Sequence, residues 1–224
     1  MDKYLSIITN FGCHYQCPEC VVRNNGLKMP KTKEESSYGL LLSQIMCNEN
    51  TITDGVNWVS VSGGGDPLFH WWEHQLWWAG FFQSCKTAGM KTELHTSYHC
   101  ATFDSQVLMF PYGKFDRVVY HLHYPEDLDD IERVENEIVR VVFVVSDYMT
   151  ENIIKDIADF VKSSPNIDEL SFRQRVDENY NTTYYLHDFL KAGHKKDWWY
   201  IEQNDYNLYY HNGKVYTKYR DIFE

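Results

Sequence analysis

The 224-residue sequence contains no apolar run approaching the ~20 residues that a membrane-spanning helix needs. Its first residues, MDKYLSIIT, are too few and too acidic for a secretory signal peptide. Basic residues are scarce, with 21 Lys and Arg against 32 Asp and Glu. The resulting net charge of −11 argues against a broad surface for nucleic acid or anionic membrane. The sequence therefore predicts a cytoplasmic protein with no membrane partner and no bulk nucleic-acid binding.

Internal repeats, low-complexity tracts and long linkers are also missing from the sequence. Apolar residues make up 43% and charged residues 24%, a composition typical of a globular chain. The length suits one sizeable domain with a real core. Within that domain we predict a core at residues 1–178 and a C-terminal extension at residues 179–224, packed on the core.

Segments with the pattern of strands alternate along the chain with segments of helical spacing. Strands are expected at residues 3–9, 57–62, 91–97, 117–123, 138–147 and 169–176. Helices are expected at 36–48, at 70–89, from 125 onward and at 150–164, the last capped by Asp147 or Thr150. Such alternation favours parallel β/α units. The predicted fold class is therefore α/β, a partial (β/α)6 barrel with mostly parallel strands.

The tail after residue 176 is rich in Tyr and Trp and contains Asn212-Gly213. Asn-Gly between alternating residues is the strongest short signal for a β-hairpin. The sequence therefore predicts an aromatic-rich C-terminal hairpin laid against the barrel.

Three cysteines lie within the eight residues CHYQCPEC, at Cys13, Cys17 and Cys20. In a reducing compartment, such a close set indicates metal binding or catalysis rather than disulfides. A structural zinc site is usually closed by four ligands, and no second CxxC pair is present. A [4Fe-4S] cluster held by three thiolates keeps one iron open for a ligand. Cys47, Cys85 and Cys100 are scattered and are expected to be small buried hydrophobic residues.

The spacing Cys13-x3-Cys17-x2-Cys20, directly after the first predicted strand, resembles the signature of the radical S-adenosylmethionine (SAM) enzymes. The resemblance implies that these cysteines hold a [4Fe-4S] cluster whose open iron binds S-adenosyl-L-methionine. It further implies reductive cleavage of SAM to a 5′-deoxyadenosyl radical, which abstracts a hydrogen atom from the substrate. The fold implied by the resemblance is a partial (β/α)6 barrel, which the strand count also predicts.

A second motif, GGGDP, follows the second predicted strand and falls on the same rim of a parallel sheet. Gly64, Gly65 and Asp66 resemble the GGE-P turn of that family, whose backbone binds the SAM amino group. Glycine suits this role because it lets the backbone approach a ligand closely. The alternative is a plain strand-to-helix turn capped by Asp66. This sequence departs from the family pattern by Asp in place of Glu, and by Glu19 where an aromatic residue usually precedes the third cysteine.

Other candidate cofactor contacts are Glu19, Thr96, Ser97, His121, His123, Ser146 and Arg173, most of them at strand ends. The hydroxyl groups of Thr96 and Ser97 either touch SAM or satisfy local backbone groups. His121 and His123 share one face of a strand, and we expect that face to be the barrel interior. Arg173 either points inward, as a clamp for a carboxylate or phosphate, or forms an outward ion pair.

Partners follow from the same resemblance. An electron donor such as flavodoxin or ferredoxin would be needed, and the substrate is expected to be a small polar or nucleoside-like molecule. A peptide substrate, as for a peptide-modifying enzyme or a glycyl-radical activase, is the alternative. A non-catalytic zinc or iron–sulfur binding module is the alternative from another class.

Overall fold

The structure, a computed structural model, describes residues 3–15, 17–24, 26–34, 56–99, 107–133, 138–173, 175, 186–202 and 208–223. The predicted helix at 36–48 lies outside the described residues, as do Cys47 and Cys100. The predicted boundary after residue 178 also lies outside them.

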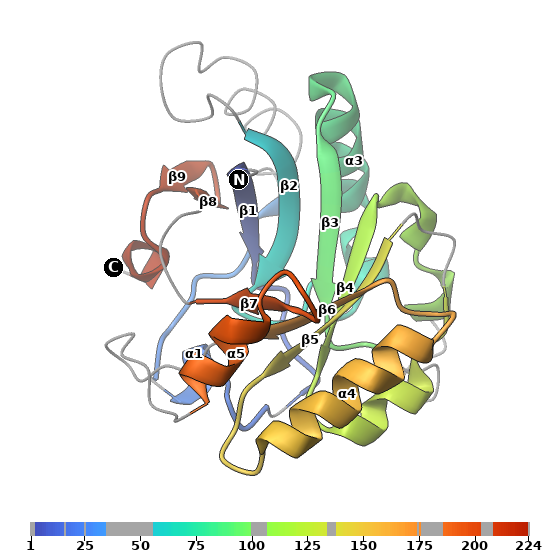
Figure 1. Ribbon diagram of the computed structural model, residues 1–224. Coiled ribbons are helices and arrows are strands. Elements are labelled where there is room, and N and C mark those ends of the chain that lie inside the picture. Colours follow the sequence, from blue (N-terminus) through green and yellow to red (C-terminus); the bar gives the residue numbers. More distant parts are fainter. Residues whose placement is uncertain are drawn as a thin grey trace.

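In the described part of the chain, nine strands form one sheet in the order β7-β6-β5-β4-β3-β2-β1-β8-β9. The strands are β1 (Lys3–Thr9), β2 (Val56–Gly63), β3 (Lys91–Thr96), β4 (Arg117–Leu122), β5 (Ile138–Val144), β6 (Glu169–Arg173), β7 (Trp199–Ile201), β8 (Leu208–His211) and β9 (Lys214–Tyr216). All neighbours pair in parallel except β8 and β9. The first six strands lie side by side in chain order, as an unclosed (β/α)6 barrel requires (Figure 1). The predicted fold class is confirmed.

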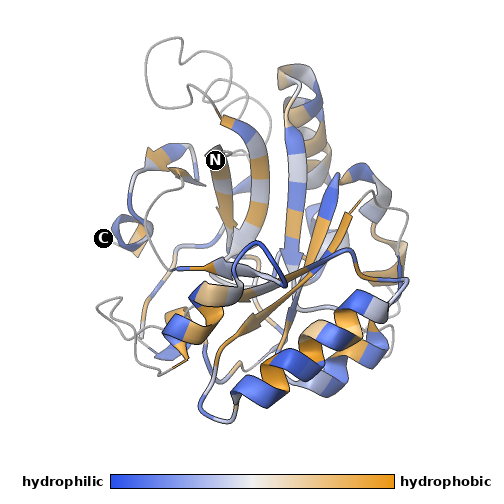
Figure 2. Ribbon diagram, in the orientation of Figure 1, coloured by the Kyte–Doolittle hydropathy of each residue, from blue (hydrophilic) through white to orange (hydrophobic). Residues whose placement is uncertain are grey.

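Helices cover the outer face of this sheet. The helical segments are α1 (Val21–Asn24), η2 (Trp71–His74), α3 (Gln75–Ala88), η3 (Val107–Met109), η4 (Tyr112–Lys114), η5 (Pro125–Asp130), α4 (Glu151–Ser163), α5 (His187–Gly193) and η6 (Tyr219–Phe223). Helix α4 is apolar along one side and polar along the other (Figure 2). Its apolar side chains join those of α3 and of alternate strand positions in one hydrophobic core. The opposite face of the sheet is called the inner face below.

Several boundaries differ from the sequence-based prediction. The helix expected at 70–89 is divided into the 3-10 turn η2 and α3, after His70 in a left-handed conformation (φ 49°). Gly89, also left-handed (φ 65°), ends α3 as predicted. The helix expected from residue 125 is only the short 3-10 segment η5, because Ile131 returns to extended backbone. Thr150 caps α4 by accepting a hydrogen bond from the Ile153 N–H at 3.3 Å.

The C-terminal hairpin extends the sheet beyond the six-stranded core. Asn212 and Gly213 both have positive φ and connect the antiparallel strands β8 and β9, as the sequence predicts. Strand β8 pairs in parallel with β1, so the hairpin continues the sheet at that edge. At the opposite edge, β7 pairs with β6, and no strand was predicted at this position. The hairpin therefore lies at an edge of the barrel, although the predicted domain boundary itself stays a prediction.

No helix within the described residues combines the length and the hydrophobicity that crossing a bilayer would take.

Candidate cofactor and substrate site

The cysteine loop and the glycine turn are joined by backbone hydrogen bonds. The Gly64 N–H donates to the Thr9 carbonyl at 2.9 Å, and the Asp66 N–H donates to the Gly12 carbonyl at 3.0 Å. These bonds continue the pairing of β1 with β2 beyond the strand ends. The two sequence motifs therefore lie side by side at the carboxyl edge of the parallel sheet, where α/β proteins carry their ligand sites.

Close packing of the chain against itself explains why glycine is needed in this turn. A Cβ atom at position 65 would lie 2.1 Å from the Gly12 carbonyl oxygen. A Cβ atom at position 64 would lie 2.2 Å from the Met29 sulfur. The close approach of a ligand is the reason for these glycines that the sequence suggests. The structure adds a second reason, because any side chain at residue 65 would push away the backbone that leads into Cys13.

Asp66 connects the turn after β2 to the tip of β3. Its carboxylate accepts hydrogen bonds from the Ser97 N–H at 2.7 Å, from the Leu68 N–H at 2.9 Å and from the Thr96 hydroxyl at 2.9 Å. The side chain is only 4% exposed, and this burial raises the pKa of Asp66 to about 6 despite the hydrogen bonds. Asp66 therefore positions the turn, and the Thr96 hydroxyl proton is committed to it.

The three thiols of the cysteine loop affect one another electrostatically. Burial, together with negative charge on Cys13 and Cys20, raises the pKa of Cys17 to about 12. Burial likewise raises the pKa of Cys13, with smaller contributions from Asp66 and Cys20. Thiolates held this close repel one another unless a cation lies among them. Three thiols in one short loop are a donor set that suits a soft metal centre.

Short hydrogen bonds hold the second half of the loop in a compact turn. The Arg23 guanidinium donates to the Cys17 carbonyl at 2.6 Å, and the Asn24 side chain donates to the Pro18 carbonyl at 2.6 Å. The Cys20 sulfur accepts the Arg23 N–H at 3.4 Å. These bonds fix the backbone between the second and third cysteines before any metal binds.

Across the residues that the structure describes, no group of three or more His, Cys, Asp or Glu side chains is already arranged to hold a metal ion. The chemistry of the donor set fits a cluster, because three thiols share one short loop and repel one another when ionised. Binding such a group would turn the sulfur atoms toward a common point and release their protons.

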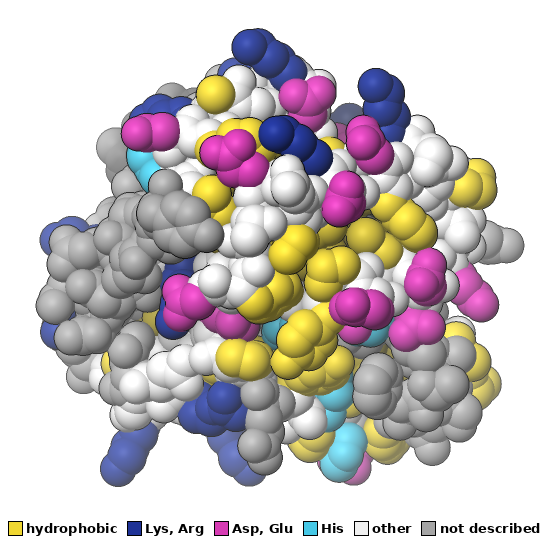
Figure 3. All heavy atoms as spheres, turned by 60° about the horizontal axis from the view of Figure 1, so that its bottom comes forward, with side chains coloured by type: hydrophobic (Ala, Val, Ile, Leu, Met, Phe, Trp, Pro, Cys, Tyr) yellow, Lys and Arg dark blue, Asp and Glu magenta, His cyan; other side chains and the backbone are white. Residues whose placement is uncertain are grey.

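The rim around the cysteine loop carries aromatic and acidic side chains. Glu19 lies close enough to Arg175 and Asp147 for their charges to affect its pKa, which burial raises. Arg175 and Asp147 form an ion pair of 2.8 Å across the ends of β6 and β5. The ring of Tyr15 lies 4.9 Å from the ring of His123. Figure 3 shows the molecule with the bottom of Figure 1 turned forward, and hydrophobic side chains gather near the centre of this face with charged side chains of both signs around them.

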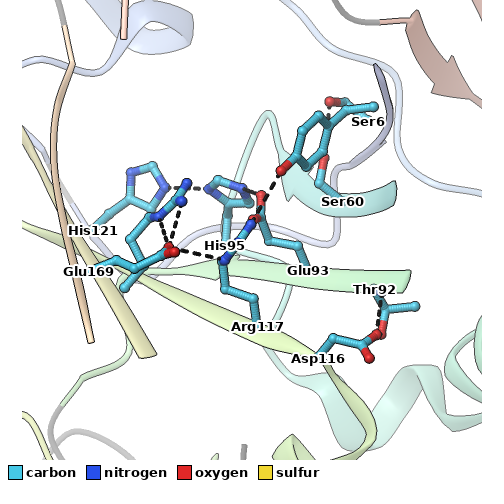
Figure 4. Close-up of polar contacts among 11 residues, drawn as sticks. Ser6, Ser60, Thr92, Glu93, His95, Asp116, Arg117, His121 and Glu169 are labelled. Atoms are coloured by element: carbon cyan, nitrogen blue, oxygen red, sulfur yellow. Dashed lines mark hydrogen bonds and ion pairs between the residues drawn. The ribbon is translucent and has the colours of Figure 1, made fainter. Parts of the chain in front are cut away.

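A chain of polar contacts runs along the inner face of the sheet (Figure 4). His95 contacts the Glu93 carboxylate through Nε2 at 2.6 Å and contacts His121 Nε2 through Nδ1 at 2.9 Å. Desolvation, followed by the charges of His95 and Arg173, holds the pKa of His121 well below its usual range, so His121 is neutral. Tyr120 and Leu122, its neighbours on β4, belong to the hydrophobic core on the other face.

Two arginines complete this inner network. Arg117 Nη1 lies 2.7 Å from Glu93 Oε2, and Arg117 Nε lies 3.2 Å from Glu169 Oε2. Arg140 Nε donates to the same Glu169 oxygen at 2.6 Å. The negative charges of two carboxylates are therefore balanced by the positive charges of two guanidinium groups within the barrel. This network was not predicted from the sequence, although polar residues at every second strand position, such as Glu93 and His95, are a signal for it.

The network makes stability depend on pH in an acidic window. Burial alone would raise the pKa of Glu93, but His95 and Arg117 outweigh burial and hold it at about 2, below its ordinary 4.5. A depressed carboxyl pKa contributes stability above about pH 4.5 and loses it as pH falls toward about 2. We expect the free energy of unfolding of wild type to exceed that of Glu93→Gln by about 3 kcal/mol near neutral pH. In urea titrations this difference should shrink below about pH 4.5; a difference that is constant down to pH 3 would contradict the assignment.

The remaining candidates from the sequence occupy the ends of β5 and β6. Ser146 is buried just after β5, and its hydroxyl oxygen has no hydrogen-bond partner among the described residues. Arg173 ends β6 on the inner face, two residues after the buried Ser171. The structure therefore places Glu19 near the ends of β5 and β6. Asp66, Thr96 and Ser97 form a cluster at the ends of β2 and β3, and the Asp66 backbone joins that cluster to the cysteine loop.

No protein-family model matches the sequence, and no curated protein matches it. Among solved structures, the fold is similar to the crystal structure of Streptococcus suis SuiB bound to S-adenosylmethionine, with a TM-score of 0.52 at 15% sequence identity. The similarity covers 86% of this chain and 43% of the SuiB chain, so the chain spans less than half of that protein's length. The chain therefore shares its fold with a protein that binds SAM.

Proposed function

We propose that this protein is a radical SAM enzyme. The observation that carries the proposal is the side-by-side placement of the Cys13-x3-Cys17-x2-Cys20 loop and the Gly64-Gly65-Asp66 turn at the carboxyl edge of a partial barrel. Similarity in fold to SAM-bound SuiB supports it. Cys13, Cys17 and Cys20 would hold a [4Fe-4S] cluster, which supplies, when bound, an open iron for SAM and the electron that splits its sulfonium bond.

The residues of the chain itself would bind and orient SAM. The turn at Gly64 and Gly65 would offer its backbone to the SAM amino group, and Asp66 would hold that turn in position through its three hydrogen bonds. The rim aromatic residues Tyr15 and Tyr148 would shield the reaction from water, which matters because a primary carbon radical reacts with stray hydrogens. An external one-electron donor such as flavodoxin or ferredoxin would be required.

For the substrate we propose a small polar or nucleoside-like molecule. The inner face supports this choice, because it presents charged and neutral polar groups, not an apolar surface, toward the barrel interior. Peptide substrates are the alternative, and the hydrophobic and charged face shown in Figure 3 is the feature that would contact them.

Anaerobic reconstitution with iron and sulfide tests the function. We expect about four irons per chain, a broad visible absorbance, and formation of 5′-deoxyadenosine with dithionite and SAM. Stoichiometric zinc without SAM cleavage would instead identify a non-catalytic metal-binding module.

Replacing Asp66 by alanine should weaken SAM binding while the iron content stays unchanged. The variant loses three hydrogen bonds that fix the glycine turn, each worth about 1.5–3 kcal/mol for a charged acceptor. Only part of this lost stabilisation weakens the binding of SAM, because the rest lowers the stability of the fold. We therefore expect a rise in the SAM dissociation constant of roughly tenfold to 100-fold. Asp66→Asn is the matched control, because it keeps an acceptor oxygen and should bind SAM more tightly than Asp66→Ala. Unchanged SAM affinity in Asp66→Ala would contradict the placement of the turn.

A further inference from the structure

Three arginines project from the inner faces of β4, β5 and β6, and their surroundings differ. Arg117 and Arg140 both contact Glu169, and Arg117 also contacts Glu93. The Arg173 side chain has no hydrogen bond or ion pair to any described residue, and its Nε atom is buried without a partner although the residue as a whole is half-buried. A guanidinium is charged at every accessible pH, and a buried N–H donor without an acceptor is costly. The contrast indicates that the counter-ion of Arg173 comes from a ligand.

Two further groups next to Arg173 define what that ligand looks like. Ser171 shares the inner face of β6, is fully buried, and has a hydroxyl oxygen without a partner in the described structure. His121, on β4, is near enough for the Arg173 charge to lower its pKa. Arg173 and Ser171 together offer hydrogen-bond donors to an oxyanion, which the planar guanidinium can bind through two parallel bonds.

The His95 contact fixes how His121 can bind a ligand. The Glu93 carboxylate accepts the proton on His95 Nε2, and the proton between His95 Nδ1 and His121 Nε2 can belong to either ring. Where that proton is on His121, its Nε2 donates to His95 and its own Nδ1 is an acceptor toward the ligand. In that arrangement the Glu93–His95 pair acts as a positioning element for His121. A ligand that satisfies the whole site then carries a hydrogen-bond donor beside its anionic group.

We propose that Arg173, Ser171 and His121 form a substrate subsite inside the barrel that binds a carboxylate with a neighbouring hydroxyl or amino group. The subsite lies on β6 and β4, whereas the glycine turn assigned to SAM follows β2, and three strands separate β6 from β2. Arg173, which the sequence suggested as a cofactor contact, is thus assigned to the substrate. Only this assignment to the substrate rests on the proposed function, because anion binding itself needs neither cluster nor SAM.

Isothermal titration calorimetry with acetate and glycolate tests the subsite. These probes differ by one hydroxyl group. Wild-type protein, as purified and after reconstitution, should bind glycolate about tenfold more tightly than acetate. Arg173→Gln should weaken both anions at least tenfold, and Arg173→Lys should restore part of the affinity. Arg175→Gln is the matched control and should bind both anions like wild type, because Arg175 already pairs with Asp147.

A second variant tests the histidine. His121→Phe keeps a planar ring but has no acceptor on the ligand side, so glycolate should bind no better than acetate. Anion binding unchanged in Arg173→Gln would overturn the proposal. Displacement of the anions by SAM would also overturn it, because Arg173 would then bind the carboxylate of SAM. Arg173-dependent anion binding in a protein that forms no cluster would refute the radical SAM function alone and leave the subsite standing.

Discussion

Replacing Cys17 by alanine should abolish formation of 5′-deoxyadenosine. Two thiolates cannot replace three as ligands of a [4Fe-4S] cluster, and Cys17 is the thiol whose pKa both neighbours raise. After anaerobic reconstitution, we expect the iron content to fall well below that of wild type and the product to fall to background. Iron analysis and chromatographic detection of 5′-deoxyadenosine measure both effects.

Cys85→Ala is the matched control for this prediction. Cys85 is a free cysteine buried on α3, in the hydrophobic core and not in the loop. Its loss should leave iron content and product formation close to wild type, at a cost in stability of about 1–2 kcal/mol from the small cavity. Product formed by a cluster-free preparation of Cys17→Ala would contradict the assignment of the loop.

Replacing Arg117 by methionine should lower the free energy of unfolding by a large amount, because Arg117 lies between two carboxylates on the inner face. Arg117→Met leaves Glu93 buried without its guanidinium partner. Removing one partner of a buried ion pair typically costs about 3–5 kcal/mol. Urea unfolding should show this loss as a lower midpoint with an unchanged slope.

Arg133→Met provides the comparison, because Arg133 pairs with Asp168 at 2.6 Å where both side chains are 37% exposed. An exposed pair contributes about 0–1 kcal/mol. The double variant Arg117→Met with Glu93→Gln should recover part of the stability lost in Arg117→Met alone, since the stranded charge is gone. Equal losses in Arg117→Met and Arg133→Met would show that the inner network is not a buried ion-pair system.

Local signals in the sequence predict much of the fold. The strand at 3–9 has the predicted bounds, Gly89 ends a helix, Thr150 caps another and Asn212-Gly213 makes the hairpin turn. Each of these features depends on residues that are neighbours in the chain. The pairing of β8 with β1 joins segments about 200 residues apart, and no local pattern specifies it.

The candidate site also has a part that local sequence predicts and a part that it does not. The cysteine loop and the glycine turn can be predicted because the residues of each motif lie close together in the chain. Their adjacency follows from the parallel order of β1 and β2. The inner network is different, since Glu93, Arg117 and Glu169 come from three strands whose register alone brings them within 3.2 Å. The same register sets Arg173 near His121, so its unpaired state could only be recognised in three dimensions.

The most direct test of the central claim is electron–nuclear double resonance on the reduced, reconstituted protein with SAM labelled with ¹⁵N at its amino group. If the loop of Cys13, Cys17 and Cys20 keeps one iron open for SAM, the cluster spin should show hyperfine coupling to that nitrogen. The coupling should disappear in Cys17→Ala. A reduced cluster that shows no coupling to labelled SAM, or one whose fourth iron is held by a protein side chain, would contradict the account.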